Sequence, residues 1–280
     1  MSGTIIIGAG QAGSAAAAKL RNLGYKGDIT LIGVEDAPPY QRPPLSKKYM
    51  LGEMELERLY LRPIDFYEMN NITLRLGTRV DAIETVNKTI LVQGETLSYD
   101  NLILTTGSWP RRLPAKIGGD LAGVYNMRDL ADADAMADEF QDGRRALIIG
   151  GGYIGLEAAA VAAKKGVNVT LVEMADRILQ RVAAPQTSDY FRAAHTAQGV
   201  NIREGIGLDH LIARDGRVGA AKLSDGSEIE IDFAIVGVGI LPASELAEAA
   251  GITLDNGIMV DEFGRTSAPN VYAAGDCASL

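Results

Sequence analysis

Two groups of three glycines with the same spacing are the most informative residues of the chain. Each group stands between a short apolar run and an alanine-rich stretch, and the two groups are Gly8, Gly10, Gly13 and Gly150, Gly152, Gly155. The first glycine of such a turn adopts backbone angles that a Cβ atom obstructs, the second lets the main chain approach a pyrophosphate, and the third lets the helix pack on the strand. The helix then directs unpaired N–H groups and its positive dipole end at the phosphates. The spacing therefore predicts two dinucleotide sites.

Two glutamates would complete these sites. The run DITLIGVE ends in Glu35 and the run NVTLVE ends in Glu173. A carboxylate at the end of the second strand accepts hydrogen bonds from the adenosine 2′- and 3′-hydroxyls and repels a 2′-phosphate. Glu173 therefore favours NAD over NADP at the second site. The spacing of Glu35 is slightly long for this rule, so a solvated carboxylate at a strand end is the alternative for that residue.

The elements that must position these residues are those of an α/β protein. Strand–turn–helix units are expected at Thr4–Leu20 and Ala146–Lys165. Other expected helices are Pro63–Met69, Asp129–Phe140 and Pro185–Gln198, and other expected strands are Ile72–Leu76, Arg79–Glu84, Thr89–Val92, Tyr99–Gly107 and Asp232–Gly239. Turns are expected at Asp215-Gly216 and Asp225-Gly226. Prolines and charges at Trp109–Pro114 predict a crossover, and strand-like runs near the end of the chain predict a return to the first domain.

Composition restricts the classes of function. With 280 residues, 47% hydrophobic and 22% charged, the chain is typical of a soluble enzyme of two domains. The net charge of −9 disfavours nucleic acid as a partner. No apolar stretch is long enough to span a membrane, and the first strand starts too early for a signal peptide, so we expect a cytoplasmic protein. Cys277 is the only cysteine, which excludes an internal disulfide, and the two histidines indicate no metal site.

Several strings of the sequence resemble one family of flavoproteins. They are RPPLSK at Arg42–Lys47, GGGYIGLE at Gly150–Glu157, VGVGILP at Val236–Pro242 and TSAPNVYAAGDCA at Thr266–Ala278. The chain is similar to FAD-dependent NADH:ferredoxin reductases, which serve bacterial cytochromes P450 and ring-hydroxylating dioxygenases. The resemblance implies an α/β fold of two Rossmann-like dinucleotide-binding domains in three layers. Residues 1–112 and 243–280 would bind FAD and residues 113–242 would bind NAD. The resemblance also implies a C-terminal interface domain, which we expect to be missing from this chain.

The resemblance also implies which residues bind the cofactors. FAD would contact Gly8, Ala9, Gly10, Ala12, Gly13, Glu35, Arg42, Lys47, Thr106, Gly107 and Asp276. NADH would contact Gly152, Tyr153, Ile154, Glu173 and Gly239. Lys47 and Glu157 would pair beside the flavin as catalytic residues, because a cation stabilises the electron density of a reduced flavin and a carboxylate offsets the cost of that partly buried cation. Without the resemblance, both would be interpreted as surface residues.

The function implied is transfer of hydride from NADH to FAD, followed by transfer of single electrons to a [2Fe-2S] ferredoxin. Two alternatives remain open: a rubredoxin reductase, and a non-catalytic flavin- and NAD-binding module similar to apoptosis-inducing factor. Thioredoxin and glutathione reductases are excluded because they need paired cysteines. NADH peroxidases and oxidases are disfavoured because Gln41-Arg42-Pro43 occupies the region where their peroxidatic cysteine is expected.

Overall fold

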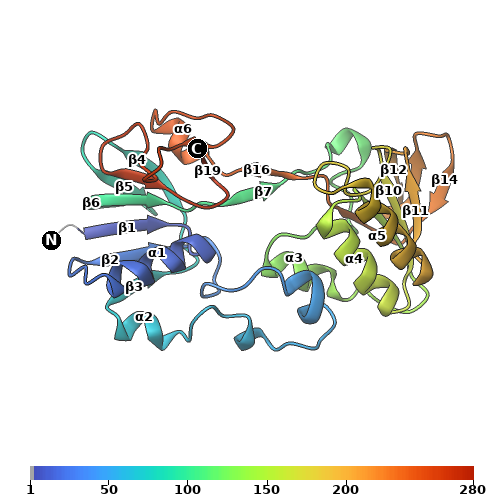
Figure 1. Cartoon of the computed structure of the whole chain (residues 1–280), viewed down its shortest axis with the longest axis horizontal. Helices are drawn as coiled ribbons and strands as arrows, with labels where there is room; N and C mark the ends of the chain where they lie inside the picture. Colours follow the sequence, from blue (N-terminus) through green and yellow to red (C-terminus); the bar gives the residue numbers. More distant parts are fainter. Residues whose placement is uncertain (1–2) are drawn as a thin grey trace. The chain divides into compact units, whose positions relative to one another are not determined.

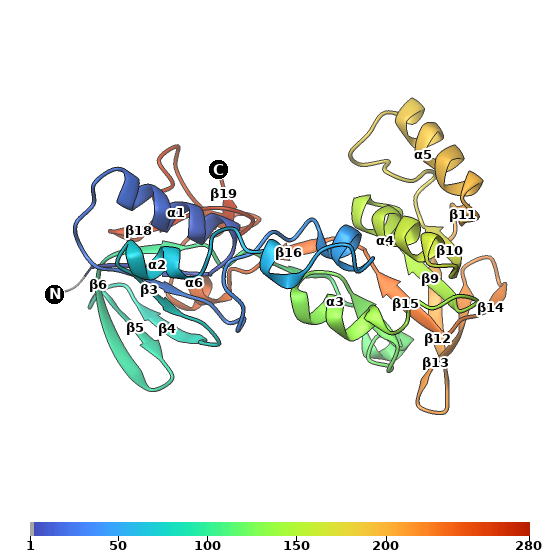
Figure 2. The ribbon, with the colours of Figure 1, turned by 90° about the horizontal axis from the view of Figure 1, so that it is seen from below.

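The computed structural model of the protein describes residues 3–280, and these residues divide into two compact units (Figures 1 and 2). The first unit comprises the described residues up to Gln41, together with Leu56–Trp109 and Leu241–Leu280. The second unit comprises Arg42–Glu55 and Pro110–Ile240. The chain therefore passes from one unit to the other four times.

A parallel sheet forms the centre of the first unit. Its strands lie in the order β3 (Ile72–Arg75), β2 (Ile29–Ile32), β1 (Gly3–Ile7) and β6 (Glu95–Leu104), and β18 (Val271–Ala273) pairs with the second half of β6. The first half of β6 continues into an antiparallel sheet with β5 (Thr89–Val92) and β4 (Val80–Glu84). The carboxyl ends of β1, β2, β6 and β18 consequently meet along one edge.

Both faces of this parallel sheet are buried, as the consecutive isoleucines of β1 require. Ile6 packs with residues of helix α1 (Gln11–Asn22) and with Tyr67 of helix α2 (Asp65–Met69). Ile5 and Ile7 face the other way, towards β4, β5 and helix α6 (Glu245–Ala249). Because successive side chains of a strand point to opposite faces, an unbroken apolar run needs cover on both sides. The first unit therefore has three layers.

The second unit contains a sheet of five parallel strands. Their order is β11 (Asn201–Glu204), β10 (Asn168–Glu173), β9 (Arg145–Ile149), β15 (Phe233–Val236) and β8 (Val124–Asn126). Helix α4 (Tyr153–Lys164) covers β9, β10 and β15, α5 (Pro185–Ala197) lies against α4 and β11, and α3 (Leu130–Ala137) contacts β8. The antiparallel strands β12 (Leu208–Arg214), β13 (Arg217–Leu223) and β14 (Glu228–Glu230) pack on the opposite face through Leu211 and Val218.

The structure confirms the predicted α/β fold with two Rossmann-like halves. The helices expected from the sequence correspond to α2, α3 and α5, and the strands expected in the first half correspond to β3, β4, β5 and β6. The turns at Asp215-Gly216 and Asp225-Gly226 join β12 to β13 and β13 to β14. The remaining short elements are η1 (Leu45–Tyr49), η2 (Leu56–Arg58), η3 (Ala115–Ile117), the pair β7 (Ser108–Pro110) with β16 (Ile240–Pro242), and the pair β17 (Ile258–Met259) with β19 (Ala278–Ser279).

The segment Arg42–Glu55 packs in the second unit, whereas the domain limits expected from the sequence kept it within residues 1–112. Tyr49 donates a hydrogen bond of 2.7 Å from its hydroxyl to Asp134 of α3, and Leu45 and Met50 are buried. These contacts join residues that lie far apart in the sequence, so no local sequence pattern predicts them. The assignment of FAD to one domain and NAD to the other stays a prediction.

Candidate active site

The predicted glycine turn of the first unit lies where the parallel strands end. Gly8 follows β1, Glu35 follows β2, Thr106 follows β6 and Asp276 follows β18. The loop after β18 also approaches α1, because a Cβ atom placed on Gly275 would lie only 3.0 Å from the Cβ of Ala12. Ligands of open α/β sheets bind at the carboxyl ends of the strands. The first unit therefore brings its predicted site residues to the edge where a ligand is expected.

The three glycines of this turn differ in what surrounds them. Gly8 has a φ of +114°, and a Cβ atom placed on it would lie 2.0 Å from the carbonyl oxygen of Thr105. A Cβ atom on Gly13 would lie 2.0 Å from the carbonyl oxygen of Gly8. A Cβ atom on Gly10 would have no heavy atom of residues 3–280 within 4 Å, other than those of its own chain neighbours. Packing thus requires the first and third glycines, while the second faces open space.

The second unit repeats this pattern. Gly150 has a φ of +108°, and a Cβ atom on it would lie 2.4 Å from the carbonyl oxygen of Gly237. A Cβ atom on Gly155 would lie 2.0 Å from the carbonyl oxygen of Gly150. Gly152, immediately before α4, again has open space around it within the described chain. Each turn therefore leaves an open space at a helix N-terminus, here called the cradle, which a side chain on the second glycine would fill. Both cradles fit the pyrophosphate of a dinucleotide.

Protein hydrogen bonds orient the two candidate ribose-binding carboxylates. Glu173 accepts hydrogen bonds from the N–H of Gly151 at 2.7 Å and from the N–H of Ala175 at 2.8 Å. A carboxylate oxygen can accept more than one hydrogen bond, so Glu173 keeps capacity for ribose hydroxyls. In the first unit, the buried Tyr40 donates its hydroxyl to Glu35. Sequence reasoning missed Tyr40, because a tyrosine in a proline-rich loop carries no signal of its partner.

Two further polar contacts shape the edge of the first unit. The hydroxyl of Thr106 donates to the carbonyl oxygen of Ala243 at 2.5 Å. The buried Ser108 donates from its hydroxyl to Asp276 at 2.9 Å and so holds the carboxylate expected to bind the ribityl chain. Ser108 was also missed from the sequence, since its partner lies 168 residues away.

The second unit brings Lys47 and Glu157 together. Lys47 lies in η1 and Glu157 in α4, and the distance from Nζ to Oε2 is 2.7 Å. The side chain of Lys47 is 46% exposed and that of Glu157 is 32% exposed. An ion pair this exposed contributes little to stability, which leaves the lysine able to exchange partners. Their catalytic role stays a prediction.

A cavity of about 240 Å³ lies beside this ion pair. It is lined by Arg42, Pro43, Leu45, Ser46, Lys47, Met127, Arg128, Ile154 and Glu157. Arg42 donates from its guanidinium to the carbonyl oxygen of Arg128 at 2.9 Å, which joins the start of the segment to the loop after β8. The ion pair therefore borders a space that can admit part of a ligand.

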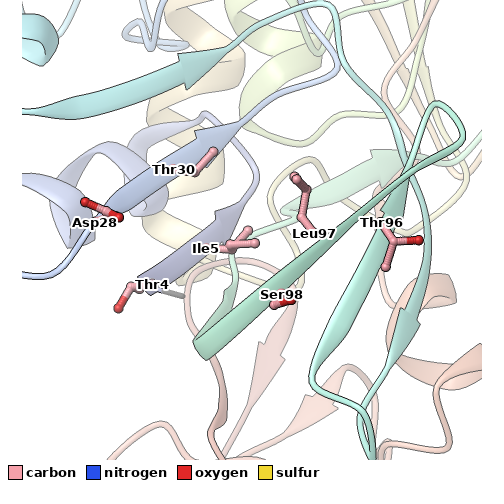
Figure 3. Close-up of a pocket in the computed structure, with 8 residues that line it drawn as sticks. Thr4, Ile5, Asp28, Thr30, Thr96, Leu97 and Ser98 are labelled. Carbon is pink, nitrogen blue, oxygen red and sulfur yellow. The ribbon is translucent and has the colours of Figure 1, made fainter. Parts of the chain in front are cut away.

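A second cavity, of about 440 Å³, lies in the first unit at the opposite ends of the strands (Figure 3). Its lining includes Thr4 and Ile5 from the start of β1, Asp28 just before β2, and Ser98 from the first half of β6. This edge is the amino edge of the parallel strands, away from the glycine turn. The cavity therefore does not coincide with the candidate nucleotide site.

The predicted site residues are divided between the units. The first unit holds Gly8, Ala9, Gly10, Ala12, Gly13, Glu35, Thr106, Gly107 and Asp276, and the second holds Arg42, Lys47, Gly152, Tyr153, Ile154, Glu157, Glu173 and Gly239. Tyr153 and Ile154 are exposed at the start of α4, and Gly239 has a φ of +105°. Arg42 and Lys47, which the resemblance placed against FAD, are thus carried by the unit that contains the second glycine turn.

The described residues 3–280 contain no helix that is long and apolar enough to cross a membrane. Within the same residues, no group of three or more His, Cys, Asp and Glu side chains is arranged to hold a metal ion.

Comparisons with known proteins agree with this fold. The chain is 44% identical over 276 residues to a ferredoxin–NAD(P)(+) reductase of Sphingomonas sp, covering 98% of this chain and 66% of that protein. It is 40% identical over 275 residues to a rubredoxin–NAD(+) reductase of Pseudomonas putida, covering 98% and 71%. The crystal structure of a covalent putidaredoxin reductase–putidaredoxin complex superposes with a TM-score of 0.96 at 40% identity, covering 99% and 68%.

The chain thus spans about two thirds of the length of the Sphingomonas reductase. These matches confirm the resemblance to ferredoxin reductases that the RPPLSK and GGGYIGLE strings indicated. The model of the pyridine nucleotide-disulphide oxidoreductase family matches residues 3–280. With a matching sequence model, a matching fold and two glycine cradles, the chain belongs to the pyridine nucleotide-disulphide oxidoreductase family.

Proposed function

We propose that the chain binds FAD in its first unit and NADH in its second, and acts as an NADH:ferredoxin oxidoreductase. The proposal rests on the repeated cradle. Packing requires the first and third glycines of each turn, whereas Gly10 and Gly152, the second glycines, face open space. Membership of the family implies a flavin and a pyridine nucleotide. That the flavin is FAD and that the pyridine nucleotide is NADH is our proposal.

Glu173 supports NADH as the reductant. Its carboxylate is fixed by two backbone N–H groups at the end of β10, where an adenosine ribose is expected. A fixed negative charge repels a 2′-phosphate and accepts hydrogen bonds from free hydroxyls. Initial rates measured with NADH and with NADPH test this choice, and equal values of kcat/KM for the two would contradict it.

The residues of the chain bind and orient, while the flavin, when bound, supplies hydride acceptance and single-electron transfer. The two helix N-termini would hold the pyrophosphates, and Glu35 and Glu173 the riboses. Lys47 would offer a cation to the flavin ring, and Glu157 would offset the cost of that cation. No side chain needs to donate or accept a proton in the hydride step.

Stopped-flow mixing of the FAD-loaded protein with NADH under anaerobic conditions tests the proposed role of Lys47. We expect Lys47→Ala to slow flavin reduction at least about tenfold, because the variant lacks the cation that stabilises the developing charge. Lys48→Ala is the matched control, since Lys48 is the next residue and is exposed. An unchanged rate in Lys47→Ala would remove Lys47 from the mechanism.

The names of the relatives support an iron–sulfur electron carrier, either a ferredoxin or a rubredoxin, as the electron acceptor. Titration of the reduced protein with candidate [2Fe-2S] ferredoxins and rubredoxins, followed through cytochrome c reduction, distinguishes the two. We expect a saturable increase with a ferredoxin. A response to rubredoxin alone would favour the rubredoxin reductase. Binding of both cofactors without reduction of any acceptor would favour a non-catalytic module.

A further inference from the structure

We propose that Ser46 is a positioning residue that holds Glu157 in place whether or not Lys47 is paired with it. The inference rests on the proposed function, because it concerns the ion pair expected to serve the bound flavin. Ser46 was not among the residues singled out from the sequence. It lies between Leu45 and Lys47 in η1 and lines the cavity of about 240 Å³ beside the pair.

Two donors from adjacent residues meet at one oxygen atom. The hydroxyl of Ser46 donates to Oε2 of Glu157 at 2.6 Å, and Nζ of Lys47 lies 2.7 Å from the same Oε2. A hydroxyl–carboxylate distance of this length is typical of a hydrogen bond strengthened by the negative charge of the acceptor. Glu157 is therefore anchored by a neutral donor as well as by a cation.

The two donors differ in how firmly they are fixed. Ser46 is 6% exposed and has a single side-chain torsion before its hydroxyl. The backbone on either side of it is fixed, since the N–H groups of Lys47 and Tyr49 both donate to the carbonyl oxygen of Pro44 at 3.0 Å. Lys47 instead reaches Glu157 through a flexible four-carbon chain that is half exposed. Ser46 is consequently the stronger constraint on the position of the carboxylate.

This arrangement lets Lys47 move without leaving the carboxylate unpartnered. Nζ of Lys47 also lies 3.2 Å from the carbonyl oxygen of Pro43, which lines the same cavity. If Lys47 turns from Glu157 to a ligand in the cavity, Ser46 keeps its hydrogen bond to Oε2. Glu157 is then in the same place to receive Lys47 again. Without the hydroxyl, the half-exposed glutamate can turn to solvent and the pair loses its preferred geometry.

The reactivity of Lys47 towards an amine-acylating reagent, read by peptide mass spectrometry, tests this inference. An amine held by a carboxylate reacts more slowly than a free one, and Lys48 in the same peptide is an internal reference. We expect Ser46→Ala to speed acylation of Lys47 relative to Lys48 by about twofold, a part of the at most about fivefold change that corresponds to complete loss of an exposed ion pair. Equal relative rates in Ser46→Ala and the unaltered protein would overturn the proposal.

Two further variants define the limits of the measurement. Glu157→Gln removes the charge that holds Lys47 and gives the fastest relative acylation. Ser46→Thr keeps the hydroxyl and should restore the slow rate, which a simple packing defect would not explain. A Tm within about 2 °C of the unaltered protein shows that Ser46→Ala is folded, because only one hydrogen bond to a half-exposed group is lost.

The acylation is measured on the full chain with and without FAD, so it does not depend on electron transfer. We expect Ser46→Ala also to slow flavin reduction by NADH, though less than Lys47→Ala does. If acylation of Lys47 speeds up while flavin reduction is unchanged, Ser46 positions Glu157 but the ion pair does not serve the flavin, and the proposed function fails at that step. If acylation is unchanged, the positioning role itself is wrong.

Discussion

At the scale of single residues, packing requires the third glycine of each turn, whereas the second glycine faces open space. Gly155 cannot carry a Cβ atom, because that atom would lie 2.0 Å from the carbonyl oxygen of Gly150. Gly152 can carry one, since the described chain leaves the space around it open. The same contrast between Gly13 and Gly10 recurs in the first unit.

Substitution of these two glycines by alanine should separate stability from binding. We expect Gly155→Ala to lower the free energy of unfolding by about 1–3 kcal/mol, the usual cost of overpacking. Gly152→Ala should cost less than about 1 kcal/mol, which reflects only the poorer helix cap, but should weaken NADH binding because the new methyl group occupies the cradle. Thermal unfolding and fluorescence titration with NADH measure the two effects. Normal NADH affinity in Gly152→Ala would show that the open space is not the pyrophosphate site.

At the scale of elements, an ion pair joins two strands of the second unit. Asp232, just before β15, accepts hydrogen bonds of 2.8 Å from the backbone N–H and from the guanidinium of Arg145, the first residue of β9. The hydrogen bond from the Arg145 side chain is the main reason that the pKa of Asp232 lies below its usual value. The interaction fixes the starts of neighbouring strands and thereby their register.

Because the pKa of Asp232 is lowered in the folded state, the stabilisation is present above the ordinary aspartate pKa and is lost as the pH falls through the lowered one. We expect Asp232→Asn to lower the Tm at pH 7 by about 2–4 °C. This difference from the unaltered protein should shrink as the pH is lowered below about 4. A series of thermal melts from pH 7 to pH 3 measures it. Asp215→Asn, in an exposed turn of the same unit, removes the same charge and should show no such trend.

Elements formed by residues close together in the sequence were predictable, and contacts between residues far apart in the sequence were not. The strand–turn–helix units were predictable because their glycines, apolar strands and alanine-rich helices lie within about twenty residues of one another. The packing of Arg42–Glu55 in the second unit was not predictable, because it depends on contacts such as Ser46 with Glu157, 111 residues apart. Lys47 and Glu157 were recognised through the family resemblance alone, since each by itself is an exposed or half-exposed charge of ordinary appearance.

At the scale of the whole molecule, two cores and two cradles imply separate responses to two ligands. The first four N–H groups of a helix have no partner inside the helix. A bound pyrophosphate accepts hydrogen bonds from these groups and slows their exchange with solvent. The two cofactors should therefore protect different amides.

Hydrogen–deuterium exchange should show this difference. We expect FAD to slow exchange in Gly10–Gly13 and NAD⁺ to slow exchange in Gly152–Gly155, since the next amides, of Ser14 and Leu156, already donate within the helices. The turn at Asp225-Gly226 is unaffected by either ligand and serves as the reference. Protection of a single turn by both ligands would contradict the assignment of one dinucleotide to each unit.

The four passages of the chain between the units restrict how the protein can be cut or recombined. A gene fragment encoding only residues 110–240 would omit Ser46 and Lys47 and would uncover the apolar surface beneath Leu45 and Met50. A chimera that takes the second unit from a relative must import two separate stretches together, or it pairs the glutamate of one parent with the serine and lysine of the other. A functional chimera should therefore have breakpoints at both ends of Arg42–Glu55 and at both ends of Pro110–Ile240, and not at one of these positions alone.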